Sequence, residues 1–191
     1  MILLLGFPKS GTSSFQKLFT DLGYKSYHWQ KRLEFIGTMI NNNKKNKKPL
    51  LNGFLKTDVI TEMNVCYDNK NNFWPQITDY EQLYYENPDS IFILNKRDPI
   101  KILSSFKRWG KYNEKLIKYN PELLSDPSDQ AFIDFVIKHY TNIETFFSTL
   151  PNSKFITYDI ENDKLEKLSK YIDLKGVIDF PHENKNLFFK G

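Results

Sequence analysis

The chain contains a single cysteine, Cys66, among its 191 residues. An internal disulfide is therefore excluded, and a reducing compartment is the simplest environment for the protein. Long hydrophobic runs are also missing. The apolar segment at residues 1–5 is too short for a signal peptide, and no later stretch reaches the roughly 20 apolar residues that a membrane-spanning helix needs. We therefore expect a cytoplasmic protein that has no membrane partner.

A strong charge of either sign is lacking as well. The 27 Lys and Arg residues against 23 Asp and Glu residues leave a net charge of +4, which is too small to indicate nucleic-acid binding but suits a small anionic ligand. Hydrophobic residues, by contrast, make up 40% of the chain and aromatic residues 16%. This composition is typical of a packed core, and the length predicts one domain over residues 1–191.

The hydrophobic periodicity predicts alternating strands and helices. We expect strands at 2–6, 24–28, 50–56, 91–95 and 153–157, and helices at 11–22, 30–41, 77–86, 99–109, 132–150 and 164–171. Such alternation predicts an α/β fold of three layers, in which a central parallel sheet is flanked by helices. His139 lies on or beside the apolar stripe of the helix at 132–150, so we expect it to be packed rather than catalytic.

Two segments of the sequence are predicted to lie outside this framework. Residues 41–48 (NNNKKNKK) are polar and of low complexity, which is typical of an exposed mobile loop; a patch for an acidic partner is the alternative. Residues 110–129 contain Pro121 and Pro127 and are predicted to form a loosely helical connection over a ligand cleft. Lids and acceptor-binding residues often occur in such connections.

The first candidate site is the segment 2–15 (ILLLGFPKSGTSSF), where an apolar run meets a Gly/Ser/Thr loop and then a helix pattern. Such a corner points unpaired backbone N–H groups and the positive end of a helix dipole at one place, and Lys9 adds a full charge. The nucleotide-triphosphate loop requires Gly-Lys-Ser/Thr, but Thr12 stands in the lysine position. The segment thus predicts an anion site of another kind, with a plain solvated turn as the alternative.

The second candidate site is the segment 90–106 (SIFILNKRDPIKILSSF), again a strand pattern followed by a helix pattern. Arg97 ends the strand, Asp98 can cap the helix, and Pro99 fits its first turn. Ser105 follows two turns later. A planar guanidinium and a hydroxyl suit a phosphate dianion, although an Arg97–Asp98 surface pair would also explain the first two residues.

Together and in this order, the two segments resemble the 5′-phosphosulfate loop and the 3′-phosphate site of sulfotransferases that use 3′-phosphoadenylyl sulfate (PAPS). The chain looks closest to a short single-domain branch with the P-loop-like sulfotransferase fold. The resemblance implies PAPS as co-substrate and 3′-phosphoadenosine 5′-phosphate (PAP) as product. It implies that the 5′-phosphosulfate is bound by Lys9, Ser10, Gly11, Thr12 and Ser13, and the 3′-phosphate by Arg97 and Ser105.

Weaker similarities supply the remaining site residues. The segment 55–58 (LKTD) resembles the Lys-Thr-His segment of cytosolic sulfotransferases, which implies Lys56 near the transferring sulfonate and Asp58 as the base. His28, at the end of the second expected strand, is the alternative base. If Asp58 has no catalytic role, it is expected to cap a helix that follows it. Tyr158 resembles a strand-end tyrosine near the adenine. One departure is Ser14, which stands where cytosolic members have an adenine-stacking tryptophan.

The resemblance implies in-line transfer of a sulfonate group to a hydroxyl or amine of a small-molecule, carbohydrate or peptide acceptor. Lys9 would stabilise the leaving oxygen. We expect no metal, because a phosphosulfate carries less charge than a triphosphate. Two other functions remain open: a P-loop kinase for a nucleotide or metabolite, which would bind Mg·ATP, and an inactive module that has kept nucleotide binding.

Overall fold

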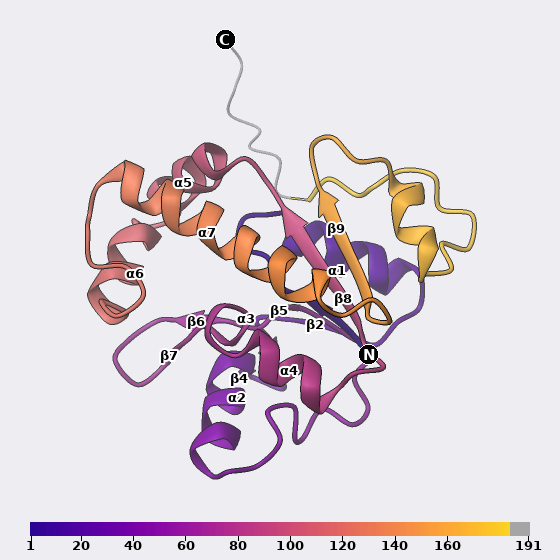
Figure 1. Cartoon of the computed structure of the whole chain (residues 1–191), viewed down its shortest axis with the longest axis horizontal. Coiled ribbons are helices and arrows are strands. Elements are labelled where there is room, and N and C mark those ends of the chain that lie inside the picture. Colours follow the sequence, from indigo (N-terminus) through magenta and orange to yellow (C-terminus); the bar gives the residue numbers. More distant parts are fainter. Residues whose placement is uncertain (184–191) are drawn as a thin grey trace.

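The computed structural model describes residues 1–183, and its centre is a seven-stranded sheet in the order β4-β3-β2-β5-β1-β8-β9 (Figure 1). Five strands are parallel: β1 (Ile2–Leu4), β2 (Ser26–His28), β5 (Val59–Glu62), β8 (Ile91–Lys96) and β9 (Lys154–Asp159). The short strands β3 (Gln30–Lys31) and β4 (Glu34–Phe35) add an antiparallel edge. A separate two-stranded sheet consists of β6 (Val65–Cys66) and β7 (Asn72–Phe73).

Helices cover both faces of this sheet (Figure 1). One face carries α1 (Thr12–Asp21) and the 3₁₀ helix η1 (Leu165–Lys170). The other carries α2 (Ile36–Lys45), α3 (Pro75–Thr78), α4 (Tyr80–Glu86), α5 (Pro99–Arg108), α6 (Tyr112–Tyr119) and α7 (Asp129–Ser148). None of the helices within residues 1–183 is long and apolar enough to cross a membrane.

Alternating side chains of the buried strands build the two cores. Leu3 and Leu5 belong to the larger core, beneath α7, whereas Ile2 and Leu4 belong to the smaller one, beneath α1. A strand buried on both faces needs apolar residues at every position, which is why β1 appears in the sequence as an uninterrupted apolar run. The three-layer α/β fold and its central parallel sheet are thus confirmed.

The register of the sheet brings the ends of three strands together. Ile2 of β1 lies opposite Val59 of β5 and Ile91 of β8, and all three strands run in the same direction. Their carboxyl ends therefore share one edge, which is where open parallel sheets bind ligands. The loop that follows β1 lies at this edge.

The strand expected at 50–56 is wrong. These residues form turns, and the strand begins only at Val59. Leu50, Leu51 and Phe54 are buried all the same, because the turns fold their side chains into the larger core. Gly53, with a φ of 92°, has a backbone conformation that does not occur in a strand. An apolar run alone does not distinguish these two cases.

The helix expected at 30–41 is also misplaced. Residues 30–35 form the β3–β4 hairpin, whose turn has Arg32 at φ 52° and Leu33 at φ 68°. Helix α2 then continues to Lys45, so most of the predicted mobile loop at 41–48 is helical. Lys44 forms an ion pair with Asp79, and the Asn43 amide donates to the Leu50 carbonyl oxygen at 2.9 Å. These tertiary contacts order a segment whose composition alone suggests a loop.

The remaining elements agree closely with the expected ones. The connection at 110–129 contains α6, as its loosely helical pattern predicts, while its role as a lid stays a prediction. Pro99 occupies the first turn of α5, and the Asp98 carboxylate accepts from the Ile100 N–H at 2.8 Å, which confirms the predicted cap. The helix expected at 164–171 is the 3₁₀ helix η1.

His139 is a packed histidine, as expected. It is 3% exposed, its ring lies edge-on to Phe7, and its Nε2–H donates to the Leu5 carbonyl oxygen at 2.7 Å. Burial lowers the pKa of the imidazole to about 4. The neutral ring therefore joins α7 to the carboxyl end of β1.

This burial makes the stability of the protein depend on pH. Below pH 6.5 an unfolded His139 takes up a proton that the folded protein binds only near pH 4, so the free energy of unfolding falls as the pH drops through this window. We expect a loss of about 3 kcal/mol from this residue. Urea titrations across the window measure it. His139→Gln, whose amide can still donate to Leu5, should flatten the dependence; an unchanged slope would contradict this assignment.

Candidate functional site

Asn95, a fully buried residue of β8, holds the loop between β1 and α1 in place. The Asn95 Oδ1 atom accepts from the Gly6 N–H at 2.8 Å, and its Nδ2 group donates to the Ser10 carbonyl oxygen at 3.1 Å and to the Ser10 hydroxyl at 2.6 Å. One side chain thus ties both ends of the loop to the neighbouring strand. The sequence analysis did not single out Asn95, because a polar residue late in a strand has no distinctive local pattern.

Gly6 is required by this close approach. A Cβ atom at position 6 would lie 2.1 Å from the Asn95 carbonyl oxygen and 2.6 Å from the Asn95 side chain. Since backbone cannot yield by such a distance, any side chain here would push the loop away from β8. The glycine therefore belongs to the packing of the loop on β8.

Two residues with a left-handed backbone conformation shape the second half of the loop. Lys9 has a φ of 68° and Gly11 a φ of 82°. Successive turns of this kind make the backbone N–H groups converge on one point. Helix α1 begins directly afterwards, and no side chain within the described residues caps it, nor is there an acidic residue in its first turn. Within residues 1–183, the positive end of the helix thus has no side-chain cap, which suits an external anion.

Lys9 lies in a partly buried, positively charged environment. Its ammonium group is 4.6 Å from the centre of the Trp109 ring, a cation–π contact with the residue that follows α5. Desolvation lowers the pKa of Lys9, as do the nearby Arg97 and Arg108 cations, while the Glu62 carboxylate raises it. Lys9 is therefore a readier proton donor than an exposed lysine.

Arg97 lies against the same loop. Its Nη1 atom donates to the Lys9 carbonyl oxygen at 2.9 Å, and its Nε atom faces the Glu161 carboxylate at 3.4 Å. Tyr140 of α7 steadies the backbone, since the Arg97 N–H donates to the tyrosine oxygen at 3.2 Å. Two segments that are 88 residues apart in the sequence thus form one cationic surface.

A buried carboxylate that the sequence analysis missed lies on the other side of the loop. Glu62, the last residue of β5, is only 7% exposed. Its Oε2 atom accepts from the Thr12 hydroxyl at 2.7 Å and lies 3.8 Å from Nε2 of His28, the last residue of β2. The Nδ1 atom of His28 is 3.2 Å from the Thr61 hydroxyl. Glu62 and His28 thus form a pair of candidate bases beside Lys9.

The signal that would have revealed Glu62 is present in the sequence. The run Val59-Ile-Thr-Glu62 is a strand pattern that ends in a charged residue, just as the run before Arg97 does. A strand expected at 50–56 draws attention to Asp58 instead, because Asp58 is the first carboxylate after that range.

Asp58 and Lys56 lie at the opposite edge of the sheet, which corrects their assignment. The Asp58 carbonyl oxygen accepts from the N–H of Ile2, at the start of β1, and its carboxylate accepts from the Lys25 N–H just before β2. Asp58 thus stands at the amino ends of these strands, whereas the loop follows the carboxyl end of β1. Lys56 precedes Asp58 and is exposed. Their sequence spacing matched the pattern, but the strand begins after them.

The other expected ligands differ in where their side chains lie. The Ser10 hydroxyl is fully buried against Asn95, and the Ser10 N–H donates to the Phe7 carbonyl oxygen at 3.2 Å, so Ser10 shapes the loop and has no donor left for a ligand. The Thr12 hydroxyl is bound to Glu62, so Thr12 can offer mainly its backbone N–H. Tyr158 is fully buried in the smaller core, and its hydroxyl donates to the Asp163 carbonyl oxygen at 3.3 Å. The structure therefore does not expose the Tyr158 ring to a ligand. Ser13 and Ser105 are half-buried.

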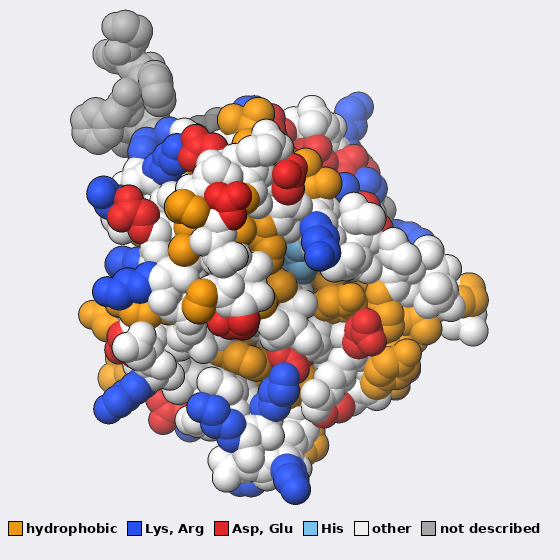
Figure 2. Space-filling view, turned by 60° about the vertical axis from the view of Figure 1, so that its left-hand side comes forward, with side chains coloured by type: hydrophobic (Ala, Val, Ile, Leu, Met, Phe, Trp, Pro, Cys, Tyr) orange, Lys and Arg blue, Asp and Glu red, His pale blue; other side chains and the backbone are white. Residues whose placement is uncertain are grey.

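The face that carries α5 and α6 shows mixed charge. In the space-filling view, a histidine side chain is visible among hydrophobic side chains, with basic and acidic side chains around it (Figure 2). A hollow of about 360 Å³ adjoins α1 and is lined by Ser13, Gln16, Lys17, Thr20, Asp21, His28 and Glu183. His28 therefore faces open space as well as Glu62.

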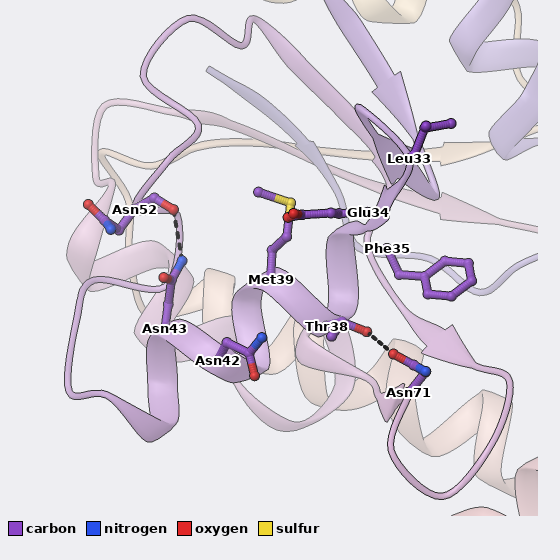
Figure 3. Close-up of a pocket in the computed structure, with 9 residues that line it drawn as sticks. All are labelled: Leu33, Glu34, Phe35, Thr38, Met39, Asn42, Asn43, Asn52 and Asn71. Carbon is purple, nitrogen blue, oxygen red and sulfur yellow. Dashed lines mark hydrogen bonds between the residues drawn. The ribbon is translucent and has the colours of Figure 1, made fainter.

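A second cavity, of about 450 Å³, runs along α2 (Figure 3). Its wall is rich in amides, including Asn42, Asn43 and Asn52, and Asn71 closes one end by accepting from the Thr38 hydroxyl. The cavity does not include Lys9 or Arg97. Its Phe35 wall packs on Trp29, the residue after His28, with 4.8 Å between ring centres.

Comparison with known proteins gives one finding. A sequence model of a protein family described as "Sulfotransferase domain" matches residues 1–131 of the 191. The match includes the loop after β1, Glu62 and Arg97, whereas Tyr158 and Glu161 lie beyond it. No curated protein matches the chain.

The role of Asn95 can be tested by its removal. Asn95→Ala should lower the free energy of unfolding by about 2–4 kcal/mol, because it deletes three buried hydrogen bonds and leaves polar groups of the loop without partners. Urea titration measures the loss. Asn46→Ala is the matched control, since its amide binds only the nearby Asn42 carbonyl oxygen, and it should cost less than about 0.5 kcal/mol. Equal small effects would mean that Asn95 does not hold the loop.

Proposed function

The chain belongs to the sulfotransferase-domain family, and from this premise we propose that it transfers a sulfonate group from PAPS to a hydroxyl or amine of an acceptor, with release of PAP. The observation that carries the choice of donor is the contact of Arg97 with the Lys9 backbone, at 2.9 Å. A group suited to a 3′-phosphate thereby adjoins a loop suited to a 5′-phosphosulfate. One ligand that carries both groups fits this arrangement better than a ligand with either alone.

In this proposal the backbone N–H groups of Gly11, Thr12 and Ser13 bind the 5′-phosphate at the open end of α1. The acceptor oxygen or nitrogen attacks the sulfur atom in line, and the bond from sulfur to the bridging oxygen breaks. The electron pair stays on that oxygen, where the Lys9 ammonium stabilises it. Because burial lowers the pKa of Lys9, its proton is also available to the leaving phosphate.

Glu62 is our candidate for the base that takes the proton of the acceptor, with His28 as the alternative. The buried Glu62 carboxylate is held by Thr12, which immediately follows the phosphate loop, so an acceptor bound beside Lys9 would meet it. His28, at 3.8 Å, can accept the same proton or stabilise the protonated pair. The rings of Trp29 and Phe35 and the cavity beside them offer surface for the rest of the acceptor.

The charges of the chain support a reaction without a metal ion. Lys9, Arg97 and Arg108 lie close enough to influence one another, and the positive end of α1 adds to them. Together they can balance the charge of a phosphosulfate. The cytoplasm is the compartment we propose, on the grounds of the single cysteine.

A kinase is the second candidate, and one observation favours it. Glu62 ends a buried strand beside the phosphate loop, where a P-loop kinase has a carboxylate that helps to bind Mg²⁺. Against it, Thr12 stands where that loop needs a lysine. Mg·ATP therefore belongs in every binding experiment.

Titration calorimetry with PAP, AMP and Mg·ATP tests the donor. We expect PAP to bind more tightly than AMP, because only PAP has the 3′-phosphate. Arg97→Ala should weaken PAP binding by about 10- to 100-fold, the range for loss of a charged hydrogen bond, and should weaken AMP binding less, because AMP loses only the support that Arg97 gives to the Lys9 backbone. Mg·ATP binding tighter than PAP would favour the kinase, and equal binding of PAP and AMP would refute the proposed donor.

A matched pair of carboxylates tests the base. Glu62→Gln should lower the rate of PAP release from PAPS by about 10²- to 10⁴-fold while PAP affinity is retained, because the amide keeps its place beside Thr12 but cannot take a proton. Asp58→Asn, at the far edge of the sheet, should leave the rate unchanged. Release is measured over a panel of phenols, sugars and amines. A fully active Glu62→Gln protein would transfer the role to His28.

A further inference from the structure

The Glu161 carboxylate lies between Arg97, a residue of the proposed 3′-phosphate site, and Lys101 of α5. Its Oε1 atom is 3.0 Å from the Lys101 ammonium and 3.4 Å from the Nε atom of Arg97. The Glu161 side chain is 25% exposed and the Arg97 side chain 27%, so this pair is partly shielded from water. The Glu161 carboxylate is thus paired with the same two cations that an external anion would need to bind.

Lys101 extends this site along α5. Arg97, Lys101 and Ser105 follow one another at intervals of four residues, and Lys101 and Ser105 therefore lie on the same side of the helix, one turn apart. Arg97 and Lys101 converge on the same oxygen of Glu161. The position and charge of Lys101 suit a ligand of the phosphate that Arg97 binds, although the resemblance assigned it no role.

The charge balance determines what happens when a phosphate arrives. One carboxylate neutralises only one of the two cations, whereas a phosphate dianion neutralises both. If Glu161 stayed in place, its negative charge would repel the phosphate at close range. The two anions therefore compete for the same pair of cations.

Glu161 can leave by moving its side chain alone. Its backbone N–H donates to the Asp159 Oδ1 atom at 2.9 Å, and the N–H of the preceding Ile160 donates to the Lys96 carbonyl oxygen at 3.1 Å. These bonds hold the main chain at the end of β9. The side chain, which is partly exposed, can turn towards water without loss of either bond.

We propose that Glu161 is an internal competitor of the 3′-phosphate, and that Lys101 binds this phosphate with Arg97 once Glu161 has been displaced. This inference rests on the proposed function and deepens it, because it names residues that set the donor selectivity. A ligand that has a 3′-phosphate displaces Glu161; a ligand without one leaves it in place. Glu161 thus weakens binding of PAPS and PAP and keeps the two cations paired in the free protein.

Two substitutions test the proposal by calorimetry with PAP and AMP. Glu161→Gln should tighten PAP binding by about tenfold, because the competing charge is gone, and Lys101→Gln should weaken it by about tenfold, as loss of one charge-assisted contact does. AMP affinity should stay the same in both. Glu166→Gln, on η1, and Lys107→Gln, whose partner is Asp129, are the matched controls and should change neither affinity.

The outcomes separate this inference from the proposed function. Equal binding of PAP and AMP by the unaltered protein would refute the donor itself. If PAP is preferred but Glu161→Gln leaves its affinity unchanged or weaker, Glu161 does not compete and the inference is overturned. If Lys101→Gln weakens PAP no more than Lys107→Gln does, Lys101 is not a phosphate ligand.

Discussion

The hydrogen bonds of Asn95 are the contact on which the candidate site depends. This buried residue joins β8 to both ends of the loop after β1, and two residues later the chain reaches Arg97. The loop that presents Lys9 and the strand end that presents Arg97 are therefore fixed relative to each other. Gly6 allows the approach, since a Cβ atom there would collide with the Asn95 backbone. The distance between the two proposed phosphate subsites follows from this packing rather than from either motif alone.

Charge pairing is the second constraint on the site. Arg97 and Lys101 face Glu161, while Lys9 is influenced by Glu62 from the other side. Each carboxylate offsets cations that are partly removed from water, and such groups are costly to leave unpaired. The same carboxylates have the proposed roles in binding and reaction. Glu62 would accept a proton from the acceptor, and a phosphate would displace Glu161 from Arg97 and Lys101. In the absence of a ligand, Glu62 and Glu161 thus offset part of the positive charge of the site.

Much of the fold could be predicted because its signals are local. The apolar run of β1, the cap of α5 at Asp98 and the apolar stripe of α7 each specify an element within a few residues, and all three were confirmed. The region 30–66 could not be predicted in the same way. Its apolar residues are buried by turns and by a hairpin, so the periodicity of strands and helices is lost there. The strand therefore ends at Glu62, beside the loop, whereas Asp58 stands before it, at the opposite edge of the sheet.

By itself, the sequence determined the alternation of strands and helices and the two segments that point cationic groups at an anion, because both depend on the order of neighbouring residues. Only the tertiary structure decided which carboxylates join those cations. Glu62 lies 50 residues from Thr12, and Glu161 lies 64 residues from Arg97, yet each pair is in contact. Tertiary packing also withdrew Tyr158 into the core. The register of parallel strands brings distant residues to one edge, and no local pattern encodes that register.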